Sequence, residues 1–156
     1  MSRRVSAVKR EVIPDIRYNN VVVSMFINRM MRGGKKSTAQ RVMYGAFELI
    51  EQRAKRPALE VFEQAMRNAT PQIEVKPRRV GGATYQVPLE VPSDRQASLA
   101  MRWLVDFADA RKGTPMSDAL AAEIMEAYQA QGNAIRKRDD VHKMAQANKA
   151  FAHFRW

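Results

Sequence analysis

The sequence contains no cysteine, and this absence excludes disulfide bonds, cysteine nucleophiles and thiolate metal sites. It has only two histidines, His142 and His153, and neither has a nucleophile or a further metal ligand at a suitable spacing. The carboxylates fall mainly on outward helix faces beside basic residues, where surface ion pairs are ordinary. We therefore expect no catalytic residue, no metal site, no cofactor and no small-molecule substrate, and predict that the protein is not an enzyme.

Long apolar runs are also missing, since none approaches the roughly 20 residues that a membrane-spanning helix requires. Residues 1–4 are basic, but no apolar block follows them, so we do not expect a secretory signal. The lack of cysteine suits a cytosolic protein. We predict that the protein has no membrane partner.

Acidic residues are few compared with basic ones, at 16 against 27, which gives a formal net charge of +11. The excess lies at the two ends: residues 1–41 carry a net charge of +8 and residues 132–156 carry +4, whereas residues 42–131 carry −1. Basic ends are often solvated tails, but here both run into periodic apolar segments. A charge of this size attracts polyanions, so the pattern favours nucleic acid as the partner.

The length of 156 residues fits one compact domain, and the spacing of apolar residues predicts six helices within it. Apparent capping boxes at residues 37–40 and 93–96 favour helix starts there, and the acidic pair Asp139-Asp140 favours the start of the last helix. The helices are expected at residues 20–31, 38–55, 57–69, 93–111, 115–131 and 139–149.

Residues 73–91 alternate apolar and polar side chains on both sides of Gly81-Gly82, which is typical of a β-hairpin. Pro77 and Pro88 cannot donate to a strand ladder and therefore need free edges. The predicted fold is mainly α: a single domain of six helices with a protruding two-stranded β-hairpin between the third and fourth. We expect the hairpin to stand apart from the body and to receive something that docks against it. Residues 1–19 are expected to form an extended basic arm, and residues 150–156 a C-terminal tail.

The segment from Gly33 to Thr38 resembles the end of a phosphate-binding P-loop, but its spacing is wrong and a helix precedes it, so nucleotide hydrolysis is not expected. The same segment suits RNA better. Residues 29–41 hold five basic residues and no acidic one, and Lys35-Lys36 stands at a helix N-terminus, where free N–H groups favour phosphate.

The candidate RNA-binding residues form four basic patches along the chain. They are Arg3, Arg4, Lys9 and Arg10 in the arm; Arg32, Lys35, Lys36 and Arg41 at the glycine-lysine turn; Lys76, Arg78, Arg79, Arg95 and Arg102 around the hairpin base; and Arg136, Lys137, Arg138 and Lys143 in a C-terminal cluster. Gly81-Gly82 would let the backbone approach RNA closely. Tyr85 could stack on a base or pack against the body, and the two histidines should be solvated or face RNA.

Four stretches of the chain resemble the small-subunit ribosomal protein seven family in its bacterial or organellar form. They are FINRMMRGGKK at 26–36, RRVGGATYQVP at 78–88, SLAMRWL at 98–104 and ANKAFAHFRW at 147–156, in order and in register over nearly the whole chain. The resemblance implies the same six helices and ribbon.

In function, the resemblance implies a cytoplasmic protein of the small ribosomal subunit that is a primary binder of the 3′ major domain of the ribosomal RNA and starts assembly of the head. It also implies a place at the subunit interface near the exit-site transfer RNA and the messenger exit path, with the hairpin residues Val80, Gly81, Gly82, Ala83 and Tyr85 closest to them. Small-subunit ribosomal proteins nine and eleven are the implied neighbours.

One alternative is an architectural DNA-binding protein, because such proteins also extend basic, proline-bearing β-arms from a helical body. Those proteins usually dimerise to use two arms, and the sequence has no strong dimer seam. An RNA-modifying enzyme is the other alternative, but no nucleophile, metal or cofactor constellation supports it.

Overall fold

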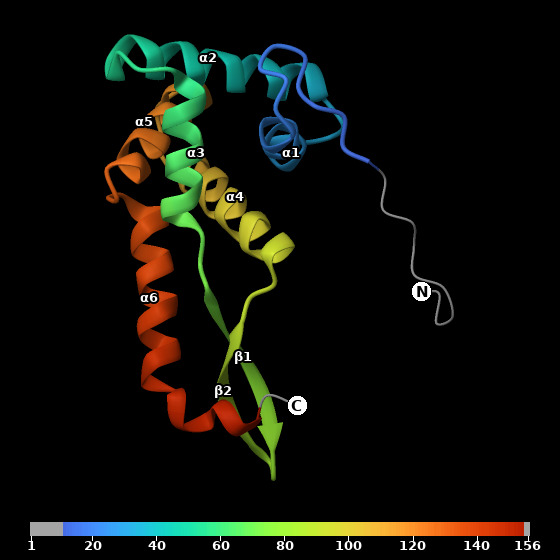
Figure 1. Ribbon diagram of the computed structural model, residues 1–156, viewed down its shortest axis with the longest axis vertical. Coiled ribbons are helices and arrows are strands. Elements are labelled where there is room, and N and C mark those ends of the chain that lie inside the picture. Colours follow the sequence, from blue (N-terminus) through green and yellow to red (C-terminus); the bar gives the residue numbers. More distant parts are fainter. Residues whose placement is uncertain (1–10, 155–156) are drawn as a thin grey trace.

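The computed structural model describes residues 11–154 of the chain, apart from the side chain of Phe154. Figure 1 shows a helical body from which a β-hairpin extends, with a long helix beside the hairpin. In chain order the described elements are α1 (Val21–Met30), α2 (Lys36–Ala54), α3 (Ala58–Ala69), β1 (Ile73–Val80), β2 (Ala83–Glu90), α4 (Ser93–Asp109), α5 (Met116–Tyr128), α6 (Asn133–Ala147) and the short 3₁₀ helix η1 (Lys149–Phe154). The predicted fold, six helices with a hairpin between the third and fourth, is confirmed.

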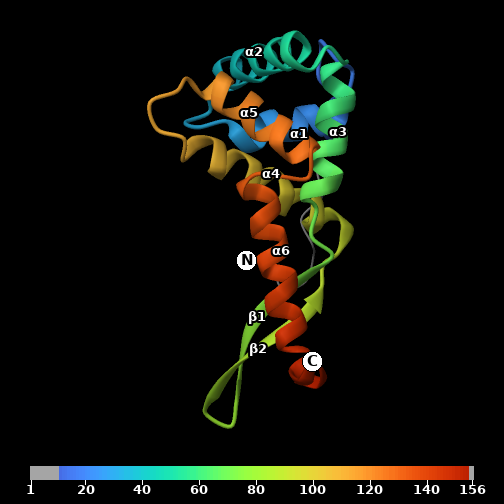
Figure 2. The same ribbon diagram turned by 90° about the vertical axis from the view of Figure 1, so that its left-hand side faces the viewer.

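The core of the body forms around α5, which contacts α2, α3 and α4 and lies between them in Figure 2. Leu120, Ile124 and Ala127 recur at helical spacing on α5 and are fully buried. A second part of the core is aromatic: the ring of Phe62 lies 5.3 Å from that of Phe26 and 5.5 Å from that of Phe47. Burial of side chains this large contributes roughly 1.5–3 kcal/mol each, so this core holds the helices in place.

The hairpin turns at Gly81-Gly82, whose φ angles of 58° and 89° lie in the left-handed region that glycine adopts without strain. The register pairs Arg78 with Tyr85 and Lys76 with Val87, so these side chains share one face of the ribbon. Figure 1 shows the ribbon extending away from the body, as expected.

The hairpin does not, however, stand apart as expected, because the chain's own C-terminal segment covers part of it. Both α6 and η1 contact the ribbon, Val87 is fully buried, and the ring of Tyr85 lies 5.0 Å from that of Phe151. A bare two-stranded ribbon is marginal in water. The segment that docks on it, α6 and η1, follows the hairpin only after α4 and α5, so local alternation along the ribbon gives no sign of it.

The predicted start of the last helix is wrong, because α6 begins at Asn133 and Asp139-Asp140 lies inside it. Its end is Ala147 rather than residue 149. The acidic partner of its N-terminus belongs to another helix: Glu123 of α5 accepts a 3.0 Å hydrogen bond from the backbone N–H of Ala134. A cap from a different element cannot be read from the local sequence.

The two predicted capping boxes are also wrong. The helix α2 begins two residues earlier than expected, after Lys35, and α4 begins after Pro92; neither N-cap side chain makes a capping hydrogen bond. At α4 the carbonyl of Pro92 already accepts the N–H of Gln96, and the Gln96 side chain donates to the carbonyl of Val91 at 2.9 Å. Ser93 therefore lies in the first helical turn instead of capping it.

The part of the expected extended arm that the structure describes contains a folded turn. Asp15 is buried, and its carboxylate accepts the backbone N–H groups of Arg17 and Tyr18 and the hydroxyl of Tyr44. Burial, followed by that hydrogen bond, raises the pKa of Tyr44 to about 12. The Tyr18 ring packs edge-on against Phe47 at 4.9 Å, so this turn is attached to the core.

The expected C-terminal tail is helical as far as the structure describes it, since Lys149–Phe154 forms η1. The remainder of the arm, residues 1–10, and the last two residues lie outside the described part of the chain. Among the helices that are described, none combines the length and apolar character needed to cross a membrane.

Candidate nucleic-acid interface

The glycine-lysine turn, residues 31–36, joins α1 to α2 and presents cations at the start of α2. Gly33 and Gly34 have φ angles of 58° and 72°, and no other atom lies within 4 Å of a Cβ built on either. Their backbone conformation, not lack of space, therefore requires glycine there. Lys35 and Lys36 are exposed, and no side chain caps the N-terminus of α2 beside them. This end of α2 thus keeps backbone N–H groups and two ammonium groups for an anion.

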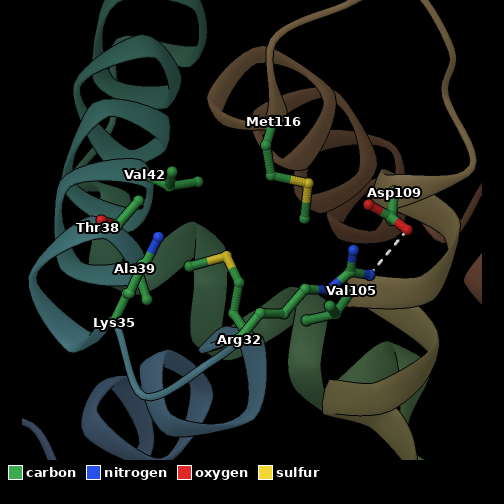
Figure 3. Close-up of a pocket in the computed structure, with 9 residues that line it drawn as sticks. Arg32, Lys35, Thr38, Ala39, Val42, Val105, Asp109 and Met116 are labelled. Carbon is green, nitrogen blue, oxygen red and sulfur yellow. Dashed lines mark hydrogen bonds and ion pairs between the residues drawn. The ribbon is translucent and has the colours of Figure 1, made fainter.

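The cations near this turn differ in whether a carboxylate already neutralises them. Lys35, Lys36 and Arg41 make no ion pair within residues 11–154. Arg32, in contrast, pairs with Asp109 at 2.9 Å and so connects the turn to the end of α4 (Figure 3). Both partners are largely exposed, so this pair contributes at most about 1 kcal/mol and leaves Arg32 free to exchange Asp109 for another anion.

The base of the hairpin carries an ion-pair cluster, centred on Glu74. Arg95 donates from Nε to both carboxylate oxygens, at 3.0 and 2.9 Å, and the ammonium of Lys76 lies 3.0 Å away. Burial alone would raise the pKa of Glu74, but hydrogen bonds from Arg95 and Lys76 outweigh it and lower that pKa. The two cations are therefore oriented by one half-buried carboxylate and together keep a net positive charge.

The sequence prediction missed Glu74, although a local signal for part of the cluster exists. Glu74 and Lys76 are two residues apart on one strand, so their side chains lie on the same face. Arg78 and Arg79 are exposed without an ion pair among the described side chains. As consecutive strand residues they point to opposite faces, so the ribbon presents a cation on each side.

Arg102 follows Arg95 by seven residues on α4, which places both on nearly the same face of that helix. Its guanidinium Nε is buried and, in the described part of the chain, has no hydrogen-bond partner. A buried donor without a partner costs about 1–3 kcal/mol.

The C-terminal cluster on α6 is separate from the glycine-lysine turn, because α6 and α1 lie on opposite sides of the molecule in Figure 1. Arg136, Lys137 and Lys143 are exposed on α6. Arg138 differs from them: its guanidinium donates to the backbone carbonyl of Asn68 and to the carboxylate of Asp139. Arg138 therefore ties α6 to α3.

The tip of the hairpin is exposed from Gly81 to Thr84, and no atom lies within 4 Å of the position of a Cβ on either glycine. Backbone at this tip can therefore approach another molecule closely. Tyr85 packs against Phe151 of η1, with 5.0 Å between the ring centroids.

Of the two histidines, only His142 differs from the predicted state, because it is half-buried and its Nε2 accepts the backbone N–H of Gln72 at 3.2 Å. This contact ties α6 to the chain just before β1. His153 is exposed. Within residues 11–154 no group of three or more His, Asp or Glu side chains could hold a metal ion. The predicted arm residues Arg3, Arg4, Lys9 and Arg10 lie outside the described part of the chain.

Residues 2–149 of the chain match the protein family described as ribosomal protein S7p/S5e, which is nearly the full length. The chain belongs to this family of ribosomal proteins. It is 57% identical over 154 residues to small ribosomal subunit protein uS7 of Chloroflexus aggregans, an alignment that covers 99% of this chain and 98% of the relative.

Two further relatives with the same name match at similar levels. The protein of Kosmotoga olearia is 54% identical over 154 residues, covering 99% of each chain. That of Hyphomonas neptunium is 54% identical over 156 residues, covering 100% of each. The resemblance seen in the sequence is therefore confirmed, and the family is one of ribosomal structural components rather than enzymes.

Proposed function

We propose that this chain is a structural protein of the small ribosomal subunit and that its basic patches bind ribosomal RNA. The observation that carries the proposal is a set of exposed cations without carboxylate partners at the glycine-lysine turn and on both faces of the ribbon, in a member of a ribosomal protein family. Cations in this state are available to phosphates, which supply most of the affinity for nucleic acid.

The finer assignment is that the chain binds the 3′ major domain of the small-subunit RNA as a primary binder and starts assembly of the head. The protein then lies in the cytoplasm at the subunit interface, with the hairpin tip near the exit-site transfer RNA and the messenger exit path. Small-subunit proteins nine and eleven are its neighbours. The ribbon projects from the helical body and is exposed at its tip, which supports contact between the tip and RNA that lies beyond the body.

Within the binding surface the patches have different roles. Lys35, Lys36 and Arg41 bind phosphates, and Arg78 and Arg79 contact RNA on either side of the ribbon. Lys76, Arg95 and Arg102 contact RNA at the hairpin base, where Glu74 orients the first two. The exposed cations of α6 form a second contact region, in which Arg138 positions the helix rather than binding phosphate.

Filter binding tests the proposal. A transcript of the 3′ major domain, an unrelated RNA of equal length and a DNA duplex are compared at one salt concentration of about 0.1–0.2 M, because affinity depends steeply on salt. We expect the head-domain transcript to bind at least tenfold more tightly than the unrelated RNA. Equal affinity for the two RNAs would contradict the assignment. Tightest binding to the duplex would favour the architectural alternative, for which the basic ribbon with Pro77 exposed is the supporting observation.

A further inference from the structure

A cavity of about 300 Å³ lies where the glycine-lysine turn meets α2, α4 and α5 (Figure 3). Its walls are mainly apolar, and its polar groups come from the turn, the first turn of α2 and the end of α4. The apolar lining residues are Met30, Ala39, Val42, Val105 and Met116, and the polar ones are Arg32, Lys35, Thr38 and Asp109.

The polar groups of this cavity have an excess of positive charge. Arg32 extends from the turn toward Asp109 and pairs with it at 2.9 Å, while Lys35 makes no ion pair in the part of the chain that is described. Arg32 and Lys35 are both exposed, so they can reach a ligand in solvent. The hydroxyl of Thr38 and the carboxylate of Asp109 add hydrogen-bond acceptors, and Thr38 adds a donor.

The size and chemistry of the cavity fit one nucleotide. Its volume is at the lower end of the roughly 300–1,000 Å³ typical of small-molecule sites and is enough for one heterocyclic base. Apolar side chains pack against the faces of a base, hydrogen-bonding groups meet its edge, and cations bind the phosphate attached to it. Unpaired bases in RNA loops and bulges are available for such contacts, whereas paired ones are not.

We propose that this cavity receives one unpaired base of the bound RNA, while Lys35 and Arg32 hold a phosphate of the same strand. The proposal rests on the proposed RNA-binding function and adds to it a site that recognises a nucleotide rather than phosphates alone. A free phosphate would leave the apolar walls unused, and an apolar side chain of a neighbouring protein would leave the two cations unused. A nucleotide uses both.

The test fills the cavity without changing its charge. Thr38→Phe places a ring in the cavity from the first turn of α2, and Ser37→Phe is the matched control, because residue 37 is exposed, does not line the cavity and points about 100° away around the helix. The probe is a transcript of the 3′ major domain, measured by filter binding over a range of salt concentrations. Chemical modification of the unpaired bases is read in each complex, and circular dichroism checks the helix content of each variant.

We expect Thr38→Phe to weaken binding about tenfold, which is at the lower end of what one packed base contributes, and Ser37→Phe to change it by less than about twofold. The slope of log affinity against log salt should stay the same in both, because no phosphate contact is lost. One base should be protected from modification by the unmodified protein and by Ser37→Phe, yet reactive in the complex with Thr38→Phe.

Three results would overturn the inference: wild-type affinity for Thr38→Phe, equal losses for the two variants, or no base whose protection depends on the cavity. Unchanged RNA binding by Thr38→Phe would leave the cavity to a protein neighbour or to no ligand. If Thr38→Phe loses helix content, Val42→Phe fills the cavity from one turn further along the same face of α2 and is judged by the same criteria. Failure of the proposed RNA-binding function would give a different result: the unmodified protein itself would bind the head-domain transcript no more tightly than the unrelated RNA.

Discussion

Glu123 is the residue at which α4, α5 and α6 are joined. It is fully buried, and its Oε2 accepts a 2.6 Å hydrogen bond from Arg111, which follows α4. Its Oε1 accepts the backbone N–H of Ala134 in the first turn of α6. Arg111 also donates to Glu126 at 2.7 Å, so one guanidinium is shared by two carboxylates. The direction in which α6 leaves the body, and hence its place beside the hairpin, depends on this group.

Replacing Glu123 with alanine should lower the free energy of unfolding by about 3–5 kcal/mol, because it leaves the half-buried Arg111 with one partner fewer and the Ala134 N–H without one. Urea denaturation at pH 7, followed by circular dichroism, measures the loss. Glu126→Ala is the matched control, since Glu126 pairs with the same guanidinium from a side chain that is 41% exposed. Its loss should be about 1 kcal/mol or less. Equal losses in the two variants would refute the special role of Glu123.

At the scale of single elements, the hairpin depends on contacts at its base and along its length. The base is held to α4 by the pair between Glu74 and Arg95, and the ribbon is held to the C-terminal segment by Tyr85 and Phe151. Because the ribbon has only two strands, these contacts decide how stiffly it projects.

Glu74→Gln should loosen the base of the hairpin by about 1 kcal/mol, a modest value because the Arg95 side chain is 46% exposed. The pKa of Glu74 in the folded protein lies below its ordinary value of 4.5, so its charged form stabilises the fold above pH 4.5. This stabilisation should disappear as the pH falls below 4.5 and the carboxylate takes up a proton.

Urea denaturation at pH 7 and at successively lower pH values measures the effect, and amide hydrogen exchange in β1 and β2 locates it. The difference between the protein and Glu74→Gln should be largest at pH 7 and shrink in acid. Glu90→Gln is the control, because Glu90 is exposed on the same hairpin and pairs across the ribbon with Ile73. A difference that grows as the pH falls, or one that Glu90→Gln reproduces, would be inconsistent with this account.

The elements themselves could largely be predicted from the sequence, and their ends less so. Apolar residues three and four apart identify α1 to α5, and alternation around Gly81-Gly82 identifies the hairpin, because both patterns arise from side-chain periodicity along a local stretch of chain. The start of α6 could not be predicted, because the acidic group at its N-terminus is Glu123 rather than Asp139. The capping boxes failed for a related reason: Ser37 and Ser93 lie inside the helices that they were expected to cap.

At the scale of the whole molecule, the positive charge is divided among separate regions. The glycine-lysine turn lies on the opposite side of the molecule from α6 in Figure 1, and the ribbon extends beyond both. An RNA that contacts all of these regions must curve or branch around the protein, which is more typical of folded RNA than of a straight duplex.

Lys35→Gln should reduce the slope of log affinity against log salt by about 0.7–1, the change expected when one phosphate contact is lost, and should weaken binding in 0.1 M salt several-fold. Filter binding to the head-domain transcript at four or more salt concentrations measures both. Lys55→Gln is the control: it removes the same charge at the opposite end of α2, a 19-residue helix about 28 Å long. A slope that falls equally in both variants would mean that position on α2 does not matter and that only net charge does.

The amino-acid sequence by itself determined the family, the mainly helical fold with its hairpin and the presence of a basic surface. These depend on composition and on periodicity between near neighbours, which a single chain displays directly. Sequence could also place Lys35 and Lys36 at a helix start, because two glycines beside an apolar helix imply a tight turn.

Only the tertiary structure decided which cations remain unpaired and which surfaces are covered. Arg32 meets Asp109 from 77 positions away, and Arg138 meets the carbonyl of Asn68 from 70 positions away. The cavity beside Lys35 needs side chains from α2, α4, α5 and the turn at once. Partners separated by dozens of residues leave no periodic signal in the chain, and packing alone brings them within a few ångströms of one another.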